Sequence, residues 1–519
     1  MPERKGLLAH LGSDLPAGLV VFLVALPLCL GIALASGAPL FSGIISGVIG
    51  GIVIGSLSGS QTAVSGPAAG LTVIVLNAIT ELGAFELFLT ATVIAGVLQV
   101  VLGILKAGVI GYYFPTSVIK GMLAGIGITL IIKQIPYAIG MSKDERIRDF
   151  VPFINDLDSL FSLKNLFSDF SFGSIIITLV SLGILLLWEK PYFKSKKVFN
   201  LIPGPLVVVL ISIGINKIFK FFIPNLYIAE IKKVNLPRIE HLDHFLDQFM
   251  FPDLGGFINP DVWIVAITIA VIASLETLLS LEAGDKIDTY KRVSPPNKEL
   301  WAQGIGNICN GLIGGIPVTA VIVRTSANIT SGSRTKASAI FHGILLLLSV
   351  LIIPRFLNLI PLASLAAILL LIGYKLARVS LWRTQYKLGL DQFLPFAVTI
   401  VGIIVFDLLK GIGFGMVVGF FFILMRNYKN SYFYKEETDD TDTIHIVLAE
   451  EVSFLNKGAL INALENIPKG KNVIIDGSNS RVIDYDVLEV IENYRTSAHE
   501  KGITVGTINI ETVDTGSLH

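Results

Sequence analysis

Long apolar segments recur along this chain and restrict what it can fold into. From Leu15 to Leu424, apolar runs of roughly 17–22 residues follow one another, and each is long enough to cross the hydrocarbon core of a bilayer. Only 15% of the 519 residues are charged, and the mean hydropathy is +0.72. A soluble domain carries about 25% charged residues. The sequence therefore predicts an all-α polytopic membrane protein, and the first run has no cleavage site typical of a signal peptide.

About fourteen transmembrane segments are expected from these runs, seven in each half of the chain. The first seven lie at approximately 15–36, 41–58, 66–80, 84–105, 116–135, 172–188 and 203–222. The second seven lie at approximately 260–281, 299–315, 318–330, 338–353, 361–377, 392–408 and 411–427. The two repeats therefore cover approximately 15–222 and 260–427.

Matching landmarks indicate how the two halves are related. The sequence FPTS begins the fifth segment at Phe114, and IPLAS begins the twelfth at Ile360. Pro67 corresponds to Pro317 in the same way. Both pairs are about 250 residues, or seven segments, apart. Because seven is odd, we expect the second half to lie upside down relative to the first, as an inverted repeat.

Two short apolar helices are interrupted at corresponding places in the two halves. Ser65–Gly70 opens the third segment, and Gly314–Pro317 precedes the tenth. Such a pair points its N-termini at a site near the membrane midplane, where free N–H groups and partial positive charge bind a small anion. The predicted backbone donors are Ala68, Ala69, Ala320, Val321 and Ile322. Their side chains are small or apolar, so the main chain would supply the binding groups.

Arg324 is the predicted cation of this site. It lies seven residues past Pro317, within a helix that is expected to start inside the membrane. An arginine at membrane depth is costly and almost always serves an ion or substrate path. The alternatives are a structural ion pair or a side chain that reaches the interface, although the interface is far from this position. We expect Arg324 to attract the anion electrostatically.

Glu276 is the predicted coupling residue. It lies in the middle of the otherwise apolar span 264–281, and Ser280 follows one turn later on the same helix face. A carboxylic acid in such a place can take up and release a proton as its exposure changes. Glu276 and Ser280 could instead coordinate Na⁺, and a fixed ion pair between Glu276 and Arg324 is the structural alternative.

Loop charges predict the orientation of the chain. Arg4 and Lys5, and the basic clusters at 190–197, 286–292 and 375–387, fall on one side of the membrane. The positive-inside rule makes that side cytoplasmic, so the N-terminus and the C-terminal region are expected there.

The composition changes after Arg426, which predicts a second domain. We expect a transmembrane domain at 1–428, an acidic linker at 429–442, a small α/β domain at 443–511 and a tail at 512–519. Strands are predicted at 444–448, 472–476 and 503–510, and helices at 457–467 and 485–499.

Several other functions are disfavoured. A net charge of zero argues against nucleic acid as a partner. Cys29 and Cys309 lie in separate segments and predict neither a disulfide framework nor a zinc site. His241 and His244 are close in sequence, but we expect them not to form a metal site. No nucleophile–base pair suggests an enzyme, and no cofactor is expected beyond H⁺ or Na⁺ as a coupling ion.

These features resemble the SulP family of anion transporters, relatives of pendrin and the motor protein prestin. The most specific stretches are Gln303–Asn307, Gly314–Pro317, Arg324–Asn328 and Gly332–Thr335, and the resemblance covers nearly the whole chain. The C-terminal module resembles the STAS domain usual in that family. The resemblance implies a seven-plus-seven repeat in a bacterial inner membrane, split into a core domain (helices one to four and eight to eleven) and a gate domain. It also implies elevator-like alternating access, a homodimer, and substrates such as sulfate or bicarbonate.

The sequence departs from the family pattern at several places. Many members have Gln and an aromatic residue where Leu28 and Ile32 stand here. In Na⁺-coupled bicarbonate members, Asp and Thr occupy the places of Glu276 and Ser280, and a further Thr that of Ile322. H⁺-coupled sulfate members carry Glu in the helix-eight place, which favours H⁺. A nucleobase carrier of the same fold and an anion sensor that signals through STAS are the competing hypotheses.

Overall fold

The computed structural model describes residues 10–108, 115–141, 170–194, 202–236, 248–406, 408–429, 432–436 and 443–513. The chain forms two compact units, which we describe separately. One contains residues 1–388 with 396–414, and the other contains 389–395 with 415–519. His241 and His244 lie outside the described residues.

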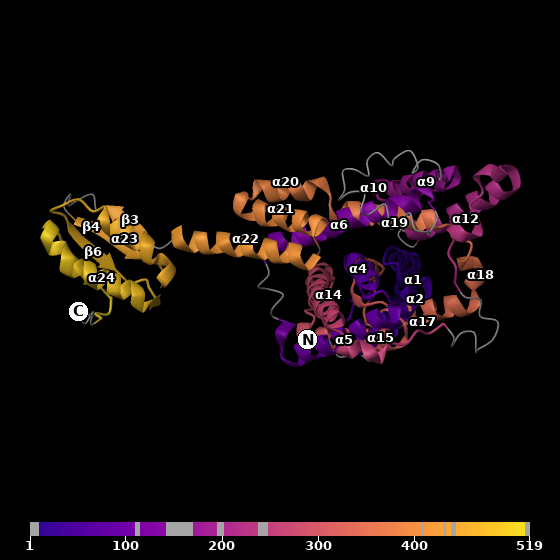
Figure 1. Cartoon of the computed structure of the whole chain (residues 1–519), viewed down its shortest axis with the longest axis horizontal. Helices are drawn as coiled ribbons and strands as arrows, with labels where there is room; N and C mark the ends of the chain where they lie inside the picture. Colours follow the sequence, from indigo (N-terminus) through magenta and orange to yellow (C-terminus); the bar gives the residue numbers. More distant parts are fainter. Residues whose placement is uncertain are drawn as a thin grey trace. The chain divides into compact units, whose positions relative to one another are not determined.

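Eight helices among the described residues are long and apolar enough to cross a membrane (Figure 1). In the first half of the chain they are α1 (Leu11–Ala35), the continuous helix Leu40–Leu57 that begins with α2 (Leu40–Ile49), α5 (Phe85–Ile104), α6 (Thr116–Ile139) and α12 (Gly204–Phe222). In the second half they are α14 (Pro260–Ile287), Leu362–Lys387 with α19 (Leu362–Leu376) and α20 (Val379–Lys387), and α22 (Leu408–Lys429), whose apolar part is Leu408–Met425. Shorter apolar helices are Ala69–Leu82 with α4 (Thr72–Leu82), α9 (Phe172–Trp188), α17 (Ala337–Ile352) and α21 (Leu390–Val405).

With α15 (Pro296–Ile313) and α16 (Ile322–Thr330), a helix lies in every predicted segment. The mostly helical membrane fold is therefore as predicted. The count of fourteen spans and the inverted relation of the two halves stay predictions.

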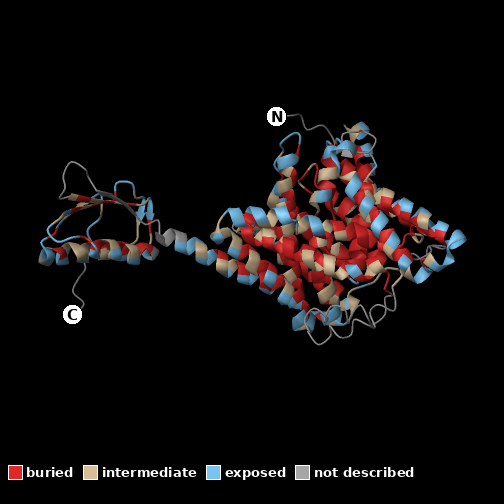
Figure 2. Cartoon of the chain, turned by 90° about the horizontal axis from the view of Figure 1, so that it is seen from above, coloured by how far each residue is buried: buried red, intermediate tan, exposed pale blue. Residues whose placement is uncertain are grey.

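Glycines allow the helices of the first unit to pack backbone against backbone. A β-carbon on Gly96 of α5 would lie 2.6 Å from the carbonyl oxygen of Gly304 of α15, and the reverse distance is also 2.6 Å. Gly127 of α6 and Gly373 of α19 form a similar pair, at 2.6 and 2.7 Å. Small residues permit this close approach where lipid supplies no hydrophobic force between helices. Buried residues fill the interior of this unit (Figure 2).

A pair of three-residue strands joins distant parts of the first unit. β1 (Ser65–Pro67) pairs antiparallel with β2 (Val318–Ala320), so that Ser65 faces Ala320 and Pro67 faces Val318. The chain continues from β1 into the helix Ala69–Leu82 and from β2 into α16. The strand pair therefore places the starts of these two helices close to each other.

The second unit contains a four-stranded sheet in the order β3-β4-β6-β8. β4 (Thr443–Leu448), β6 (Asn472–Asp476) and β8 (Thr504–Ile508) are parallel, and α23 (Lys457–Glu465) and α24 (Tyr485–Ser497) are its helices. These elements match the predicted ones. β3 (Tyr432–Glu436) was not expected, because it lies in the predicted linker 429–442. It pairs antiparallel with β4, so the sheet begins before residue 443 and the predicted boundary is wrong.

Candidate functional site

Helix α15 holds the strand pair in place through a row of buried polar side chains. The Asn307 side chain makes two hydrogen bonds to the backbone of Val318 in β2. Its Oδ1 accepts from the Val318 N–H at 2.7 Å, and its Nδ2 donates to the Val318 carbonyl at 3.2 Å. One turn earlier, Nε2 of Gln303 donates to the Ser65 hydroxyl of β1 at 2.6 Å. Both side chains are fully buried. Paired polar groups in a buried site fix one arrangement of the backbone, so α15 sets the position of both strands.

The same row continues across to α5 and toward the start of α15. Nδ2 of Asn307 also donates to Oε1 of Gln99 on α5 at 2.7 Å. Glu299 is fully buried and accepts from Gln303 at 3.0 Å and from the Ser58 hydroxyl at 2.5 Å. Glu299, Gln303 and Asn307 are spaced by four residues, so they lie on one helix face.

Arg324 lies against the backbone of the first strand. It is the third residue of α16 and is 0% exposed. Its Nη2 lies 3.4 Å from the carbonyl oxygen of Pro67 and 3.4 Å from Sγ of Cys29 on α1. Its Nε and Nη1 are buried and have no hydrogen-bond partner among the described residues. A buried guanidinium group with two donor nitrogens that have no partner attracts an anion electrostatically.

Glu276 belongs to α14, and its side chain lies beside the start of Ala69–Leu82, the helix that follows the first strand. Its carboxylate lies close against Gly70, the second residue of Ala69–Leu82. A β-carbon on Gly70 would lie 2.5 and 2.6 Å from the two carboxylate oxygens, so only glycine leaves room for them. Oε2 of Glu276 is buried and has no hydrogen-bond partner among the described residues.

Arg324 and Glu276 do not pair with each other. Among the residues that the structure describes, no ion pair within 4.0 Å joins them. Arg324 lies against Gly66, whereas Glu276 lies against Gly70. The segment Gly66–Gly70 thus contacts each charged side chain at a different residue. The fixed ion pair that was the structural alternative for these residues is not formed in this structure.

The predicted backbone donors are only partly available. Residues 65–67 and 318–320 are strands, so the two helices begin at Ala69 and Ile322, later than the predicted 66 and 318. Ala320 lies in β2, and its N–H donates to Oγ1 of Thr277 on α14 at 3.3 Å. The N–H of Val321 donates to the carbonyl of Val64 at 2.9 Å. Ala320 and Val321 therefore do not present free donors here, because a side chain of α14 and the backbone of the first interrupted segment accept their N–H groups.

The other predicted site residues lie near these groups. Ala69 and Ile322 are the first residues of their helices, where N–H groups have no helical acceptor, and Ala68 precedes Ala69. Ser280 is buried on α14, one turn after Glu276.

Sequence reasoning missed the two glycines and the α15 row. A regular spacing of Glu299, Gln303 and Asn307 within an apolar segment was a signal for a buried polar face. No sequence signal indicated that Gly66 and Gly70 face Arg324 and Glu276.

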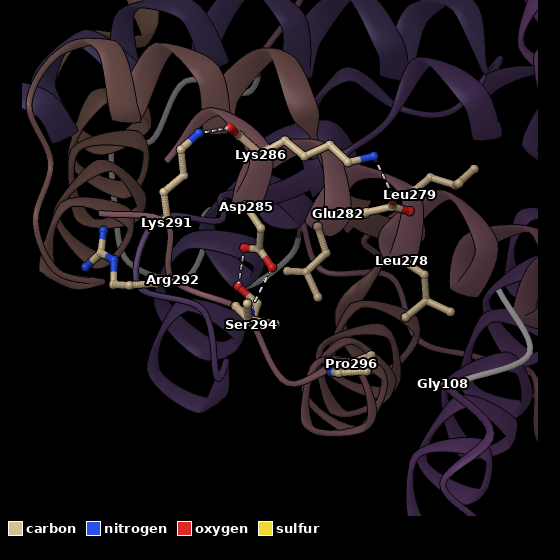
Figure 3. A pocket seen from close by; sticks show the side chains of 12 residues that line it. Gly108, Leu278, Leu279, Glu282, Asp285, Lys286, Lys291, Arg292, Ser294 and Pro296 are labelled. Carbon is tan, nitrogen blue, oxygen red and sulfur yellow. Dashed lines mark hydrogen bonds and ion pairs between the residues drawn. The ribbon is translucent and has the colours of Figure 1, made fainter. Parts of the chain in front are cut away.

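A separate cavity of about 290 Å³ lies at the end of α14 and the loop before α15 (Figure 3). Its charged side chains are engaged within the protein. Lys286 pairs with Glu282 at 2.6 Å, and Lys291 donates to the Lys286 carbonyl at 2.6 Å. Asp285 accepts from Ser294 at 2.7 and 2.8 Å. These contacts stabilise the turn between the helices and leave the cavity a weaker candidate for the anion site.

Comparison with known proteins shows the family to which this chain belongs. Residues 11–398 match the Sulfate permease family. The chain belongs to this family. A relative in the sulfate permease family, the Putative sulfate transporter YvdB of Bacillus subtilis (strain 168), is 31% identical over 439 residues, which are 84% of this chain and 77% of the relative. The Bicarbonate transporter BicA of Picosynechococcus sp. is 25% identical over 417 residues, which are 79% of this chain and 69% of the relative.

Solved structures of sulfate permease relatives have the same fold. The transmembrane domain of a cyanobacterial bicarbonate transporter BicA has a TM-score of 0.66 and 26% identity, and the match covers 78% of this chain and 98% of that domain. The murine anion transporter Slc26a9, in its inward-facing state, has a TM-score of 0.77 at 15% identity, with 98% of this chain and 87% of that chain covered. As a sulfate permease family member, the protein is a membrane transporter of anions and not an enzyme.

Proposed function

We propose that this protein is a secondary active transporter of a small inorganic oxyanion, sulfate or bicarbonate, coupled to H⁺. The observation that carries the proposal is the buried Arg324, whose Nε and Nη1 have no partner in the described residues and which lies beside Gly66 and Pro67. A charged donor in a low-dielectric site attracts an oxyanion strongly. The names of relatives supply the two candidate substrates.

In this proposal the anion lies between the starts of the helices Ala69–Leu82 and α16. Arg324 attracts it, and backbone N–H groups at Ala68, Ala69 and Ile322 help to bind it. Glu276 carries the proton, with Ser280 beside it on α14. When anion and proton move together, little net charge crosses the low-dielectric barrier, which lowers the cost of transport.

We further propose the architecture that serves this cycle. Fourteen spans form two inverted repeats, and an elevator-like movement of the core domain gives alternating access. The protein works as a homodimer in a bacterial plasma membrane, with its N-terminus and STAS-like unit in the cytoplasm. A membrane sensor of anions would share the site but would not accumulate its ligand.

Uptake into proteoliposomes tests the proposal. Labelled sulfate and labelled bicarbonate are offered separately, with an inward H⁺ gradient, an inward Na⁺ gradient or neither. We expect one of these anions to accumulate in response to the H⁺ gradient. Accumulation driven by Na⁺ alone would instead assign Glu276 and Ser280 to a sodium site. No uptake of either anion, in protein that still binds anions, would favour the sensor.

The role of Glu276 has its own test. Glu276→Gln resembles the protonated acid and cannot release a proton. We expect this variant to exchange anions across the membrane but to lose the accumulation that an H⁺ gradient drives. Accumulation equal to that of the wild type would overturn the proton role.

A further inference from the structure

A lysine lies at membrane depth on α6, outside the site described above. α6 has 24 residues, so it is about 36 Å long, whereas the hydrocarbon core of a bilayer is about 30 Å thick. With the helix centred in the bilayer, Lys133 lies about 8 Å from the midplane. A cation at this depth is costly, and by default it marks an ion or substrate path.

The ammonium group of Lys133 has one hydrogen-bond partner among the described residues, and that partner carries no charge. Nζ donates to Oδ1 of Asn77 on α4 at 3.2 Å. No carboxylate in the described part of the chain lies within 4.0 Å of Nζ. No described residue therefore neutralises this positive charge, and two of the three ammonium donors remain for a ligand.

The same contact fixes the orientation of the Asn77 amide group. Lysine has no acceptor atom, so the amide oxygen must face the ammonium group and Nδ2 must face away from it. Nδ2 has no hydrogen-bond partner among the residues that the structure describes. Asn77 therefore adds two N–H donors to the charge of Lys133, and a cation with neighbouring N–H donors suits an oxyanion.

Asn77 also lines a cavity of about 370 Å³ between α4, α14 and the start of α22. Val73, Asn77 and Glu81 line it at intervals of four residues, so the cavity follows one face of α4. Its α14 residues lie within 264–268. Glu81 and Lys410, its charged lining residues, are exposed and of opposite sign, which leaves Lys133 as the uncompensated charge beside the cavity.

The cavity and the proposed anion site lie along the same two helices. Asn77 is eight residues after Ala69, where the helix Ala69–Leu82 begins, and Thr268 is eight residues before Glu276 on α14. Eight residues correspond to about 12 Å along each helix. The cavity therefore lies to one side of the proposed site, about 12 Å from it, as an access path would.

We propose that Lys133 and Asn77 form a second anion-binding site, at which a small oxyanion stops on its way between one face of the membrane and Arg324. This inference rests on the proposed function, because it adds a pair of residues to the path of the same substrate. Lys133 attracts the anion, and Nδ2 of Asn77 donates to it. The alternative is a purely structural link between α4 and α6.

Uptake into proteoliposomes by the full-length protein distinguishes the two. The probe is labelled sulfate, or labelled bicarbonate where the wild type takes up only that anion. Lys133→Gln keeps a donor for Asn77 but removes the charge, whereas Lys133→Arg keeps both. We expect KM to rise roughly three- to tenfold in Lys133→Gln and to stay near the wild-type value in Lys133→Arg. Lys120→Gln is the matched control, because Lys120 lies near the other end of α6, and its KM should not change.

Salt and a second variant test the electrostatic part of the proposal. The difference in KM between Lys133→Gln and the wild type should shrink as potassium gluconate is raised from about 50 to about 500 mM, because ions screen the attraction of Lys133. Asn77→Asp keeps an acceptor for Lys133 but replaces the two donors with a negative oxygen. We expect it to raise KM further than Lys133→Gln does. A purely structural link would be strengthened by the new ion pair, and KM would stay at the wild-type value.

The outcomes separate this inference from the proposed function. Wild-type KM in both Lys133→Gln and Asn77→Asp, with uptake lost in Arg324→Ala, overturns the second site and leaves the proposed function standing. An equal rise in KM for Lys133→Gln and Lys133→Arg also overturns it, because the charge would then not matter. Should Lys133→Gln not fold, as its melting temperature in detergent would show, Asn77→Asp carries the same test. No uptake of either anion by the wild type overturns the proposed function and this inference with it.

Discussion

Gly66 has no side chain where the guanidinium group of Arg324 lies. A β-carbon on Gly66 would overlap Nη1 and would lie 2.8 Å from Cζ. The guanidinium can therefore lie flat against the first strand, with Nη2 directed at the Pro67 carbonyl. The position of the proposed anion-attracting charge thus depends on a residue that carries no functional group.

Gly66→Ala should weaken anion transport although it changes no charge. The new methyl group must displace the guanidinium, because real β-carbons do not approach other atoms so closely. We expect a higher KM for the transported anion, measured by uptake into proteoliposomes, with Gly55→Ala as the control. An unchanged KM would show that Arg324 does not act from its observed position.

Arg324→Ala should abolish or strongly weaken uptake while the protein still folds. A hydrogen bond to a charged group is worth about 1.5–3 kcal/mol, so affinity should fall roughly ten- to a hundredfold. Arg324→Lys keeps the charge but loses the planar set of donors, so its anion affinity should lie between that of the wild type and that of Arg324→Ala. Anion binding by the purified variants is the measurement, and near-normal affinity in Arg324→Ala would contradict the assignment.

Asn307→Ala should destabilise the protein as well as slow transport. It leaves the N–H and carbonyl of Val318 without their buried partner, and each unpaired group costs about 1–3 kcal/mol. Thermal unfolding in detergent measures the loss. Thr268→Ala is the control, because that exposed hydroxyl donates to the Ile264 carbonyl of its own helix. Equal melting temperatures for the two variants would mean that Asn307 does not anchor β2.

Removal of residues 430–519 should lower expression, assembly or rate but keep the order of anion preference. Every proposed ligand residue lies in the helical unit before residue 389. Competition uptake with unlabelled anions measures the preference. A changed order in the truncated protein would show that the second unit contributes to selectivity.

The sequence was a good guide to elements with a clear period and a poor guide to short, irregular ones. Apolar runs such as 260–281 and the strands at 444–448 and 472–476 carry enough residues to indicate their type. Three-residue strands such as Ser65–Pro67 have no detectable period, so the sequence predicts helix starts in these proline-containing segments. β3 was missed because its residues lie in an acidic stretch that resembles a linker.

The candidate site was predicted in its charges but not in its contacts. Arg324 and Glu276 could be found because a charge is costly in an apolar segment. Their neighbours could not be found, since Gly66 and Gly70 contribute only the space that the two charged groups occupy, which no side-chain pattern reveals. The ion pair that simple charge attraction suggests is absent among the described residues because each side chain lies against a different glycine.

Because β1 pairs with β2, the site is formed by two segments that are far apart in the sequence. Arg324 and Pro67, which touch, are 257 positions apart in sequence. A polypeptide that ends before Gly314 would contain Gly66, Gly70 and Glu276 but no guanidinium, and one that begins after Gly70 would contain the guanidinium without the surface it lies on. Two such pieces would form the site only by associating, and substitutions at 66 and 324 act on the same contact.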